Sequence, residues 1–151
     1  MAPLLLWMAL SAPVAQDSWS PVSDPRPDSM EGLARDLRGA DASRRRFAVR
    51  ELNRIARVSR KHEFGSLDAE STMDALQKLK FLDDYVASIC IEHLEADLEV
   101  RGCARLLGHL EAVAARPVVA AARARTERRN EARLLDRTLS ILDAAQPVGA
   151  P

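Results

Sequence analysis

The feature that most constrains the fold is a strict helical period between residues 41 and 60. At about 100° per residue, one narrow stripe of this segment is apolar or small, and the opposite side is basic. The stripe consists of Ala48, Leu52, Ile55 and Ser59. The opposite side consists of Arg46, Arg50, Arg54, Arg57 and Lys61. Because a β-strand alternates its two faces at every residue, this pattern predicts an amphipathic helix with Asp41 as its N-cap.

The rest of the chain favours the same class of structure. Ala, Leu, Arg and Glu dominate the composition, and all four are strong helix formers. We find no run of alternating β-branched residues long enough to form a strand. With 47% apolar but only 4% aromatic residues, the core must be built from Leu, Ala, Val and Ile. The sequence therefore predicts a single all-α domain over residues 29–145, made of antiparallel helical hairpins.

Caps and apolar spacing predict four further helices, at residues 29–38, 68–96, 98–115 and 117–145. Pro117 fits the first turn of the last helix, where a missing N–H costs little. Between residues 123 and 133 this helix is nearly all polar, so we expect that part to be exposed. The apolar period of the 68–96 helix consists of Met73, Leu76, Leu79, Leu82, Val86, Ile89 and Leu94.

Both ends of the chain differ from the helical part. Residues 4–14 form an apolar stretch with the length of a signal-peptide core, too short to span a bilayer. We predict a signal peptide over residues 1–15 and an exported product, periplasmic or extracellular, with no stable membrane insertion after cleavage. The alternative is a short buried N-terminal helix. Residues 16–28 carry three prolines and predict an extended linker, and residues 146–151 predict a disordered tail.

Residues 33–57 read LARDLRGADASRRRFAVRELNRIAR and resemble a HEAT-like repeat, in which a short turn joins two antiparallel helices. The positions that carry the resemblance are Leu37, Asp41, Arg45, Ala48 and Leu52. The resemblance implies that Asp41 caps the second helix and that Arg45 reaches toward an acidic group in a neighbouring turn. Arg44 departs from the pattern, because the family prefers Val there.

A weaker copy of this pattern covers residues 97–110, where Asp97, Val100, Arg101 and Ala104 are in register. After Ala104 the copy is one residue short. The alternative to a HEAT-like pair is an irregular helical bundle. HEAT-like proteins mostly serve as binding scaffolds. The resemblance therefore implies a scaffold that either covers its ends with its own outer helices or associates with a partner.

The charges fall into blocks although the net charge is zero. Residues 35–61 carry 10 basic and 3 acidic residues, residues 62–100 carry 2 and 10, and residues 101–151 carry 9 and 5. The arginine row of the 41–60 helix is a candidate site for an anionic partner, either a phosphate-bearing polymer or an acidic protein surface: Arg46, Arg50, Arg54 and Arg57. The alternative is that the row faces the acidic 68–96 helix or is simply solvated. Nucleic acid is not predicted as a partner, because no aromatic residues interleave with the arginines to stack on bases.

Cys90 and Cys103 are the only cysteines, and they lie almost symmetrically about the predicted turn at Asp97. In an antiparallel hairpin they lie at similar distances from the turn. They form either a disulfide, which an oxidising compartment permits, or two buried thiols. His93 and His109 add two potential metal ligands, but the spacings Cys-x2-His and Cys-x5-His match no standard zinc module. We therefore predict no metal site and no cofactor.

The sequence contains none of the catalytic motifs H-E-x-x-H, G-x-S-x-G or a phosphate-binding glycine loop. Asp83 and Asp84 are adjacent, so on a helix they point about 100° apart and do not converge on one site. We predict a non-catalytic protein-interaction or scaffold module of the cell envelope, not an enzyme, with a protein partner of unknown identity. The alternative is a periplasmic helical stress- or metal-sensing protein that self-associates.

Overall fold

The computed structural model describes residues 29–65 and 68–149, so the predicted signal peptide (1–15) and linker (16–28) lie outside the described residues. The described part is almost entirely helical and contains no strand, which confirms the all-α class. Its α-helices are α1 (Met30–Arg38), α2 (Ala42–Gly65), α3 (Ala69–Phe81), α4 (Ala87–Glu95), α5 (Val100–His109), α6 (Arg116–Arg125) and α7 (Arg129–Ala145). A π-helical turn, η1 (Leu82–Val86), joins α3 to α4, and a 3-10 turn, η2 (Val113–Ala115), precedes α6.

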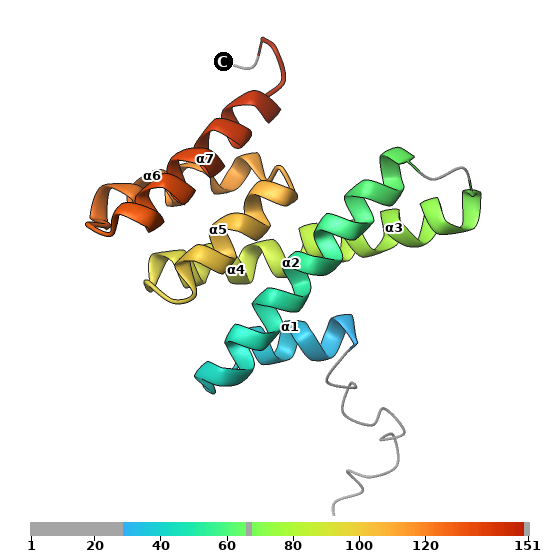
Figure 1. Cartoon of the computed structure of the whole chain (residues 1–151), viewed down its shortest axis with the longest axis horizontal. Coiled ribbons are helices and arrows are strands. Elements are labelled where there is room, and N and C mark those ends of the chain that lie inside the picture. Colours follow the sequence, from blue (N-terminus) through green and yellow to red (C-terminus); the bar gives the residue numbers. More distant parts are fainter. Residues whose placement is uncertain (1–28, 66–67, 150–151) are drawn as a thin grey trace, which may run out of the picture.

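The helices are arranged in two layers (Figure 1). In the front layer α5 lies between α2 and α7 and packs against both. In the rear layer α1, α4 and α6 each contact the front helix that follows in the chain. The described chain therefore passes between the layers in three consecutive helix pairs. The choice between a HEAT-like stack and an irregular bundle stays a prediction.

Side-chain caps begin the first two helices at the residues that the sequence indicates. Ser29 Oγ accepts a hydrogen bond from the backbone N of Gly32 at 3.0 Å. Asp41 Oδ1 accepts hydrogen bonds from the backbone N of Ser43 (2.9 Å) and of Arg44 (3.1 Å). These two bonds favour the charged carboxylate, so the pKa of Asp41 lies below its ordinary value. The turn between α1 and α2 is thus set by local hydrogen bonding.

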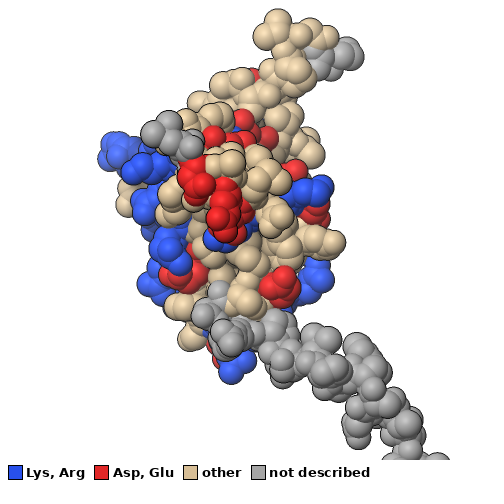
Figure 2. Space-filling view, turned by 90° about the vertical axis from the view of Figure 1, so that its right-hand side faces the viewer, with Lys and Arg blue, Asp and Glu red and all other residues tan. Residues whose placement is uncertain are grey.

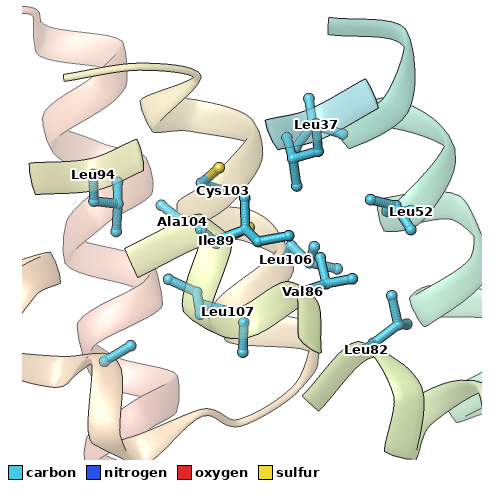
Figure 3. Close-up of a cluster of buried hydrophobic side chains, with 14 of the residues drawn as sticks. Leu37, Leu52, Leu82, Val86, Ile89, Leu94, Cys103, Ala104, Leu106 and Leu107 are labelled. Carbon is cyan, nitrogen blue, oxygen red and sulfur yellow. The ribbon is translucent and has the colours of Figure 1, made fainter. Parts of the chain in front are cut away.

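The core lies between the layers and is aliphatic, as the composition predicts. Its fully buried large side chains are mostly leucines: Leu33, Leu37, Leu52, Leu82, Leu94, Leu106, Leu107, Leu135 and Leu142. Figure 3 shows Val86 and Ile89 among several of these leucines, close to α5. None of the buried side chains in the described residues is a Phe, Tyr or Trp. Because α5 contacts α2, α4 and α7, it is the element that holds the front layer together.

The helix predicted over residues 68–96 is interrupted by the π turn η1. A π turn inserts one residue into the helical period, so the apolar side changes direction at this point. Val86 and Ile89, at and after the turn, are buried, but Met73 is 57% exposed and Leu76 is 39% exposed. The expectation that Met73 and Leu76 belong to the buried stripe is therefore wrong. The physical reason is that α3 packs chiefly against α2, which covers only one of its sides.

α2 and α5, the helices before and after this interrupted segment in the chain, also differ in length from the prediction. α2 was expected to reach residue 60, and it continues to Gly65. The helix predicted over residues 98–115 is shorter, because α5 ends at His109. Glu111 follows with a positive φ of 51°, a conformation that ends a right-handed helix. Ala114 lies beyond the end of α5 and is exposed.

The helix predicted over residues 117–145 is in fact two helices, α6 and α7, separated by a turn at residues 126–128. The polar stretch of residues 123–133 is mostly exposed, as expected. It contains the turn between the two helices and is not part of one straight helix. Thr126 supports the turn, because its hydroxyl donates to Glu131 Oε1 at 2.6 Å. The turn reverses the chain direction, so α7 packs back against α5. Leu135 of α7 is therefore buried in the common core.

Candidate functional site, a basic groove between two helices

Four arginines of α2 form one row on the outer face of the front layer. Arg46, Arg50, Arg54 and Arg57 follow one another at intervals of four, four and three residues, so they share one side of the helix. All four are exposed. Figure 2 shows basic side chains gathered along its left edge, which corresponds to the front layer of Figure 1. The row therefore faces away from the core, as its helical spacing predicts.

The arginine row does not face α3, which belongs to the acidic 68–96 segment. No ion pair joins α2 to α3 within the described ranges, and the groove that the row lines contains no residue of α3. The neighbour of the row is instead α5, which packs beside α2. The alternative interpretation, in which the acidic 68–96 helix neutralises the row, is therefore not what the described chain shows.

A close contact brings α5 against α2. A Cβ atom added at Gly102 would lie 2.8 Å from both methyl carbons of Val49, so only glycine allows this approach. Asn53 bridges the same contact, because its Nδ2 donates to the backbone oxygens of Val49 (2.8 Å) and Gly102 (3.0 Å). The polar sides of the two helices are thus carried to opposite walls of one groove.

This basic groove has a volume of about 780 Å³. One wall is the arginine row of α2, and the other consists of Arg105 and His109 of α5. Val49, Asn53 and Gly102 line the groove between the two walls. The groove is therefore built by both helices and disappears if they separate.

The groove has an excess of positive charge. Glu51 is the only carboxylate among its lining residues, and it is paired with Arg54, whose Nε lies 2.9 Å from Glu51 Oε2. The other guanidinium groups of the lining have no ion-pair partner among the residues that the structure describes: Arg46, Arg50, Arg57 and Arg105. Guanidinium groups form strong bidentate contacts with carboxylates, so the groove is suited to an anionic ligand.

His109 is the histidine of the basic groove and lies at the C-terminal end of α5. Burial lowers its pKa from the ordinary value, and nearby positive charges lower it further: those of Arg105, Arg57, Arg137 and Arg60. Arg60 is held beside it, because its Nε donates to the backbone oxygen of His109 at 3.0 Å. The imidazole is therefore favoured in its neutral form, and an anion in the groove would reduce that preference.

Cys90 of α4 and Cys103 of α5 are both buried, and both are free thiols in this structure. A hydrogen bond between the two thiols, together with burial, raises the pKa of Cys90 well above its ordinary value. The two helices thus bring the cysteines into contact. A disulfide between them stays a prediction, and alkylation of native protein with and without reductant tests it.

The remaining candidates for chemistry have structural partners. His93 is buried, and its Nε2 lies 2.6 Å from the backbone oxygen of Leu37, which ties α4 to α1. Asp83 and Asp84 are exposed in η1, and Asp84 pairs with Lys80 at 3.1 Å. In residues 29–65 and 68–149, no group of three or more His, Cys, Asp and Glu side chains is arranged to hold a metal ion.

Arg45 contacts the turn before its own helix and lies near the turn before α5. Its Nη1 donates to the backbone oxygens of Gly39 (3.0 Å) and Ala40 (2.7 Å), in the turn before α2. Its Nε lies 3.9 Å from a carboxylate oxygen of Glu99, in the turn before α5. Arg45 therefore links two neighbouring turns at one edge of the molecule.

Asp97 does not cap α5, although its place in the weaker copy corresponds to that of Asp41, which caps α2. The residue at the N-cap of α5 is Glu99, which makes no side-chain cap hydrogen bond. Asp97 Oδ1 instead pairs with Arg125 Nη2 at 3.2 Å, and the same nitrogen donates to the backbone oxygen of Leu94 at 2.8 Å. Arg125, which the sequence did not single out, therefore links the end of α6 to the turn before α5.

The sequence identified only one wall of the basic groove. The helical period of α5 places Arg101 and Arg105 away from its apolar side, and both are exposed. The same period places His109 away from the apolar side. Which element those polar side chains lie beside depends on the packing of α5 against α2, and the helical period carries no information on that packing.

None of the helices in the described part is long and apolar enough to cross a membrane. Comparison of the chain with protein-family models, with curated proteins and with solved structures gives no match.

Proposed function

We propose that this protein is a non-catalytic interaction module that binds an acidic segment of a partner protein in the basic groove between α2 and α5. The observation that carries the proposal is the set of four guanidinium groups without an ion-pair partner in the described chain. They lie on both walls of one groove: Arg46, Arg50 and Arg57 on α2, and Arg105 on α5.

The dimensions of the arginine row support a peptide as the ligand. Arg46 and Arg57 are 11 residues apart on a helix, which corresponds to about 16 Å. That length matches about five residues of an extended chain. A segment with several Asp or Glu residues can therefore place one carboxylate near each arginine, and such charge pairs favour both fast association and correct register.

The composition of the groove supports binding over catalysis. Its titratable residues other than arginine are one histidine and one carboxylate, and that carboxylate is already paired with Arg54. General acid–base work needs groups that converge on a reacting atom with matched pKa values. The lining contains no Phe, Tyr or Trp side chain, so it offers no platform of this kind on which nucleic-acid bases could stack.

We also propose a HEAT-like scaffold of the cell envelope. The consecutive helix pairs, the Asp41 cap and the contact of Arg45 with the next turn support the scaffold. Export rests on the apolar stretch of residues 4–14. It is tested by the mass of the protein recovered from its host, and a mass that retains Met1 would contradict export.

The binding proposal is tested with a charge-reversed variant, Arg46→Glu, Arg50→Glu and Arg54→Glu. We expect a fluorescein-labelled decaglutamate peptide to bind the wild type at low salt. We expect the triple variant to bind it about a hundredfold more weakly, measured by fluorescence anisotropy. Affinity purification from the native envelope then identifies the partner, which the wild type recovers and the variant loses.

A matched control separates the groove from the overall charge. Arg128, Arg129 and Arg133 are exposed around the start of α7, outside the groove, and have no ion-pair partner in the described residues. Their replacement by Glu changes the net charge by the same amount. If this control loses peptide binding as strongly as the groove variant, binding follows net charge and the groove is not the site.

A further inference from the structure

Each helix of the front layer places one arginine near His109. α2, α5 and α7 lie side by side in this layer, with α5 in the middle (Figure 1). Their arginines Arg57, Arg105 and Arg137 are exposed, and none has an ion-pair partner among the described residues. Burial lowers the pKa of His109, and the positive charges of all three arginines lower it further, so the three guanidinium groups lie close to one imidazole. We call these four residues the cationic cluster.

The contact between α2 and α5 brings Arg57 to the end of the basic groove where His109 lies. Near the start of α5, Gly102 packs against Val49 of α2. At the end of α5, the backbone oxygen of His109 accepts a hydrogen bond from Arg60 Nε at 3.0 Å. The two helices therefore run in the same direction, and Arg57, one turn before Arg60, lies near the end of α5.

A second contact brings Arg137 beside α5. Thr138 Oγ1 donates a hydrogen bond to the backbone oxygen of Ala104 at 3.2 Å. Thr138 also lies next to Gly108, one turn later on α5. Arg137 directly precedes Thr138 in α7, and Arg105 directly follows Ala104 in α5. The two arginines therefore come from adjacent helices at the same level of the layer.

The backbone at the end of α5 does not neutralise the cationic cluster. Free backbone oxygens at a helix C-terminus carry partial negative charge and attract cations. The last four of α5 are already hydrogen-bonded, that of His109 by Arg60 and the other three by backbone N–H groups. Those three bonds are Leu110 N to Leu106 O (3.0 Å), Ala112 N to Leu107 O (3.1 Å) and Glu111 N to Gly108 O (3.1 Å). The last turn of α5 therefore leaves none of its backbone oxygens unbonded for the arginines.

Arg60 also lies near His109, but its charge is balanced within the chain. Its Nη2 lies 2.7 Å from Glu111 Oε1, and its Nη1 lies 3.3 Å from Glu63 Oε2. These two carboxylates therefore neutralise Arg60 and not the cationic cluster. The three arginines of the cluster keep positive charges that no ion pair in the described chain balances.

One phosphate group matches this arrangement better than one carboxylate. A phosphate ester carries a charge of about −1.5 to −2 at pH 7 and has three strong acceptor oxygens. Guanidinium groups form bidentate hydrogen bonds with phosphate oxygens, so three of them from three helices can share one phosphate. A carboxylate carries a single charge and two oxygens, so it balances only one of the arginines.

We propose that the cationic cluster is a phosphate subsite at the end of the basic groove, which binds a phosphorylated Ser or Thr side chain of the acidic segment. The identity of the ligand rests on the proposed function, and the phosphate group goes beyond it. Arg57, Arg105 and Arg137 bind the phosphate oxygens, and His109 lies beside the bound charge. Because a nearby anion stabilises the imidazolium, phosphate binding and protonation of His109 strengthen each other.

Two labelled peptides test the subsite by fluorescence anisotropy: decaglutamate, and the same peptide with phosphoserine in place of one central Glu. We expect the wild type to bind the phosphopeptide at least about tenfold more tightly. Arg137 does not line the basic groove, so Arg137→Gln is expected to lose this preference and to bind decaglutamate much as the wild type does. Equal binding of the two peptides by the wild type overturns the proposal.

Arg133→Gln is the matched control. Arg133 is exposed one turn before Arg137 on α7 and has no ion-pair partner among the described residues, so its replacement removes the same charge from the same helix. We expect Arg133→Gln to keep the preference for the phosphopeptide. If both variants lose the preference equally, net charge causes it and the cationic cluster is not the subsite.

The imidazole of His109 reports on the subsite without any peptide. NMR titration gives its pKa in inorganic phosphate and in chloride at equal ionic strength. We expect phosphate to raise the pKa of His109 in the wild type, to raise it less in Arg137→Gln, and to leave the exposed His62 unchanged. An equal effect of phosphate and chloride on His109 overturns the subsite.

The two measurements also separate the source of the phosphate and the two proposals. A rise of the His109 pKa in phosphate, together with equal binding of the two peptides, assigns the cluster to free phosphate and overturns the phosphorylated segment. A wild type that binds no decaglutamate contradicts the proposed function, whereas the NMR titration tests the subsite alone. Failure of the subsite and failure of the groove are therefore distinguished.

Discussion

His109 connects the charge of the basic groove to pH. Its imidazole lies among guanidinium groups from three elements: Arg105 of α5, Arg57 and Arg60 of α2, and Arg137 of α7. Burial and these charges place its pKa below the ordinary value of 6.5 in the folded chain. The unfolded chain therefore binds the proton more strongly, and folding is opposed wherever the unfolded state is protonated at this residue.

The expected consequence is a loss of stability as pH falls below about 6.5. The loss begins when the unfolded state takes up the proton and is complete once pH is below the lowered pKa of the folded state. In the wild type, the unfolding free energy should fall between about pH 7.5 and pH 5.5. We expect this fall to be smaller in His109→Gln than in the wild type. The difference between the two proteins should be less than about 1 kcal/mol, because His109 is partly exposed. Urea unfolding at the two pH values measures it.

His62 provides the matched control for this experiment. It is exposed near the end of α2 and does not line the basic groove. We expect His62→Gln to keep the pH dependence of the wild type. If His62→Gln and His109→Gln change the pH dependence equally, the environment of the groove is not its cause.

At the scale of elements, α2 is the helix that the sequence predicts best. Its N-cap, its buried stripe and its arginine row are all set by the period of one helix. Ala48, Leu52 and Ser59 of the predicted stripe are buried, and Ile55 is partly buried against the core. Such a pattern is readable because a single helix buries one side whatever packs against it.

The contact of α5 with α2 depends on Gly102. In Gly102→Ala the new Cβ would meet both methyl carbons of Val49 at 2.8 Å, so the helices must move apart. Overpacking of this kind costs about 1–3 kcal/mol, and the better helix propensity of Ala returns up to about 1 kcal/mol. We expect a net loss of about 1–2 kcal/mol in unfolding free energy by urea denaturation, together with weaker decaglutamate binding, because the groove walls separate.

Gly108 on the same helix is the control for helix propensity. A Cβ at Gly108 meets its nearest atom, Ile141 Cδ1, at 3.6 Å, which is an ordinary contact. We expect Gly108→Ala to be neutral or stabilising. Val49→Ala removes two methyl groups and so makes room for the Cβ added by Gly102→Ala. We therefore expect Gly102→Ala to lower the unfolding free energy less in the Val49→Ala protein than in the wild type. An equal loss in both backgrounds would show that Val49 is not the obstacle.

Across the molecule, Arg125 adds a polar contact to the packing of α7 on α5 that joins the last helix pair to the rest. Its guanidinium binds the backbone oxygen of Leu94 and the carboxylate of Asp97, both from the α4–α5 region. We expect Arg125→Ala to cost about 1 kcal/mol, since the side chain is 43% exposed and solvent screens the ion pair. Hydrogen exchange should become faster in α6 and α7 than in α2, because the contact holds one edge of the stack.

Arg128 is the control for this change. It is exposed, three residues further along the chain, and its side chain has no ion-pair partner in the described residues. We expect Arg128→Ala to leave hydrogen exchange in α6 and α7 unchanged. Uniform acceleration over all helices in Arg125→Ala would mean that the molecule opens as one unit and that the contact does not tie one pair to the next.

Properties that belong to a single helix can be predicted from the sequence alone. The all-α class, the Asp41 cap, the aliphatic core and the arginine row all follow from helix propensity and a 3.6-residue period. The polar side of α5, with Arg105, follows in the same way. Each of these depends on residues within a few turns of one another, so no knowledge of distant contacts is needed.

Which sides of the helices pack together depends on tertiary contacts. The π turn η1 and the reversal between α6 and α7 depend on what each segment packs against, and a continuous helical period conceals both. The exposure of Met73 has the same origin, because no element covers that side of α3 in the described chain. The basic groove exists because Gly102 admits Val49 and brings two basic helix sides together. Contacts between residues about 50 positions apart are a property of packing, and a local period cannot specify them.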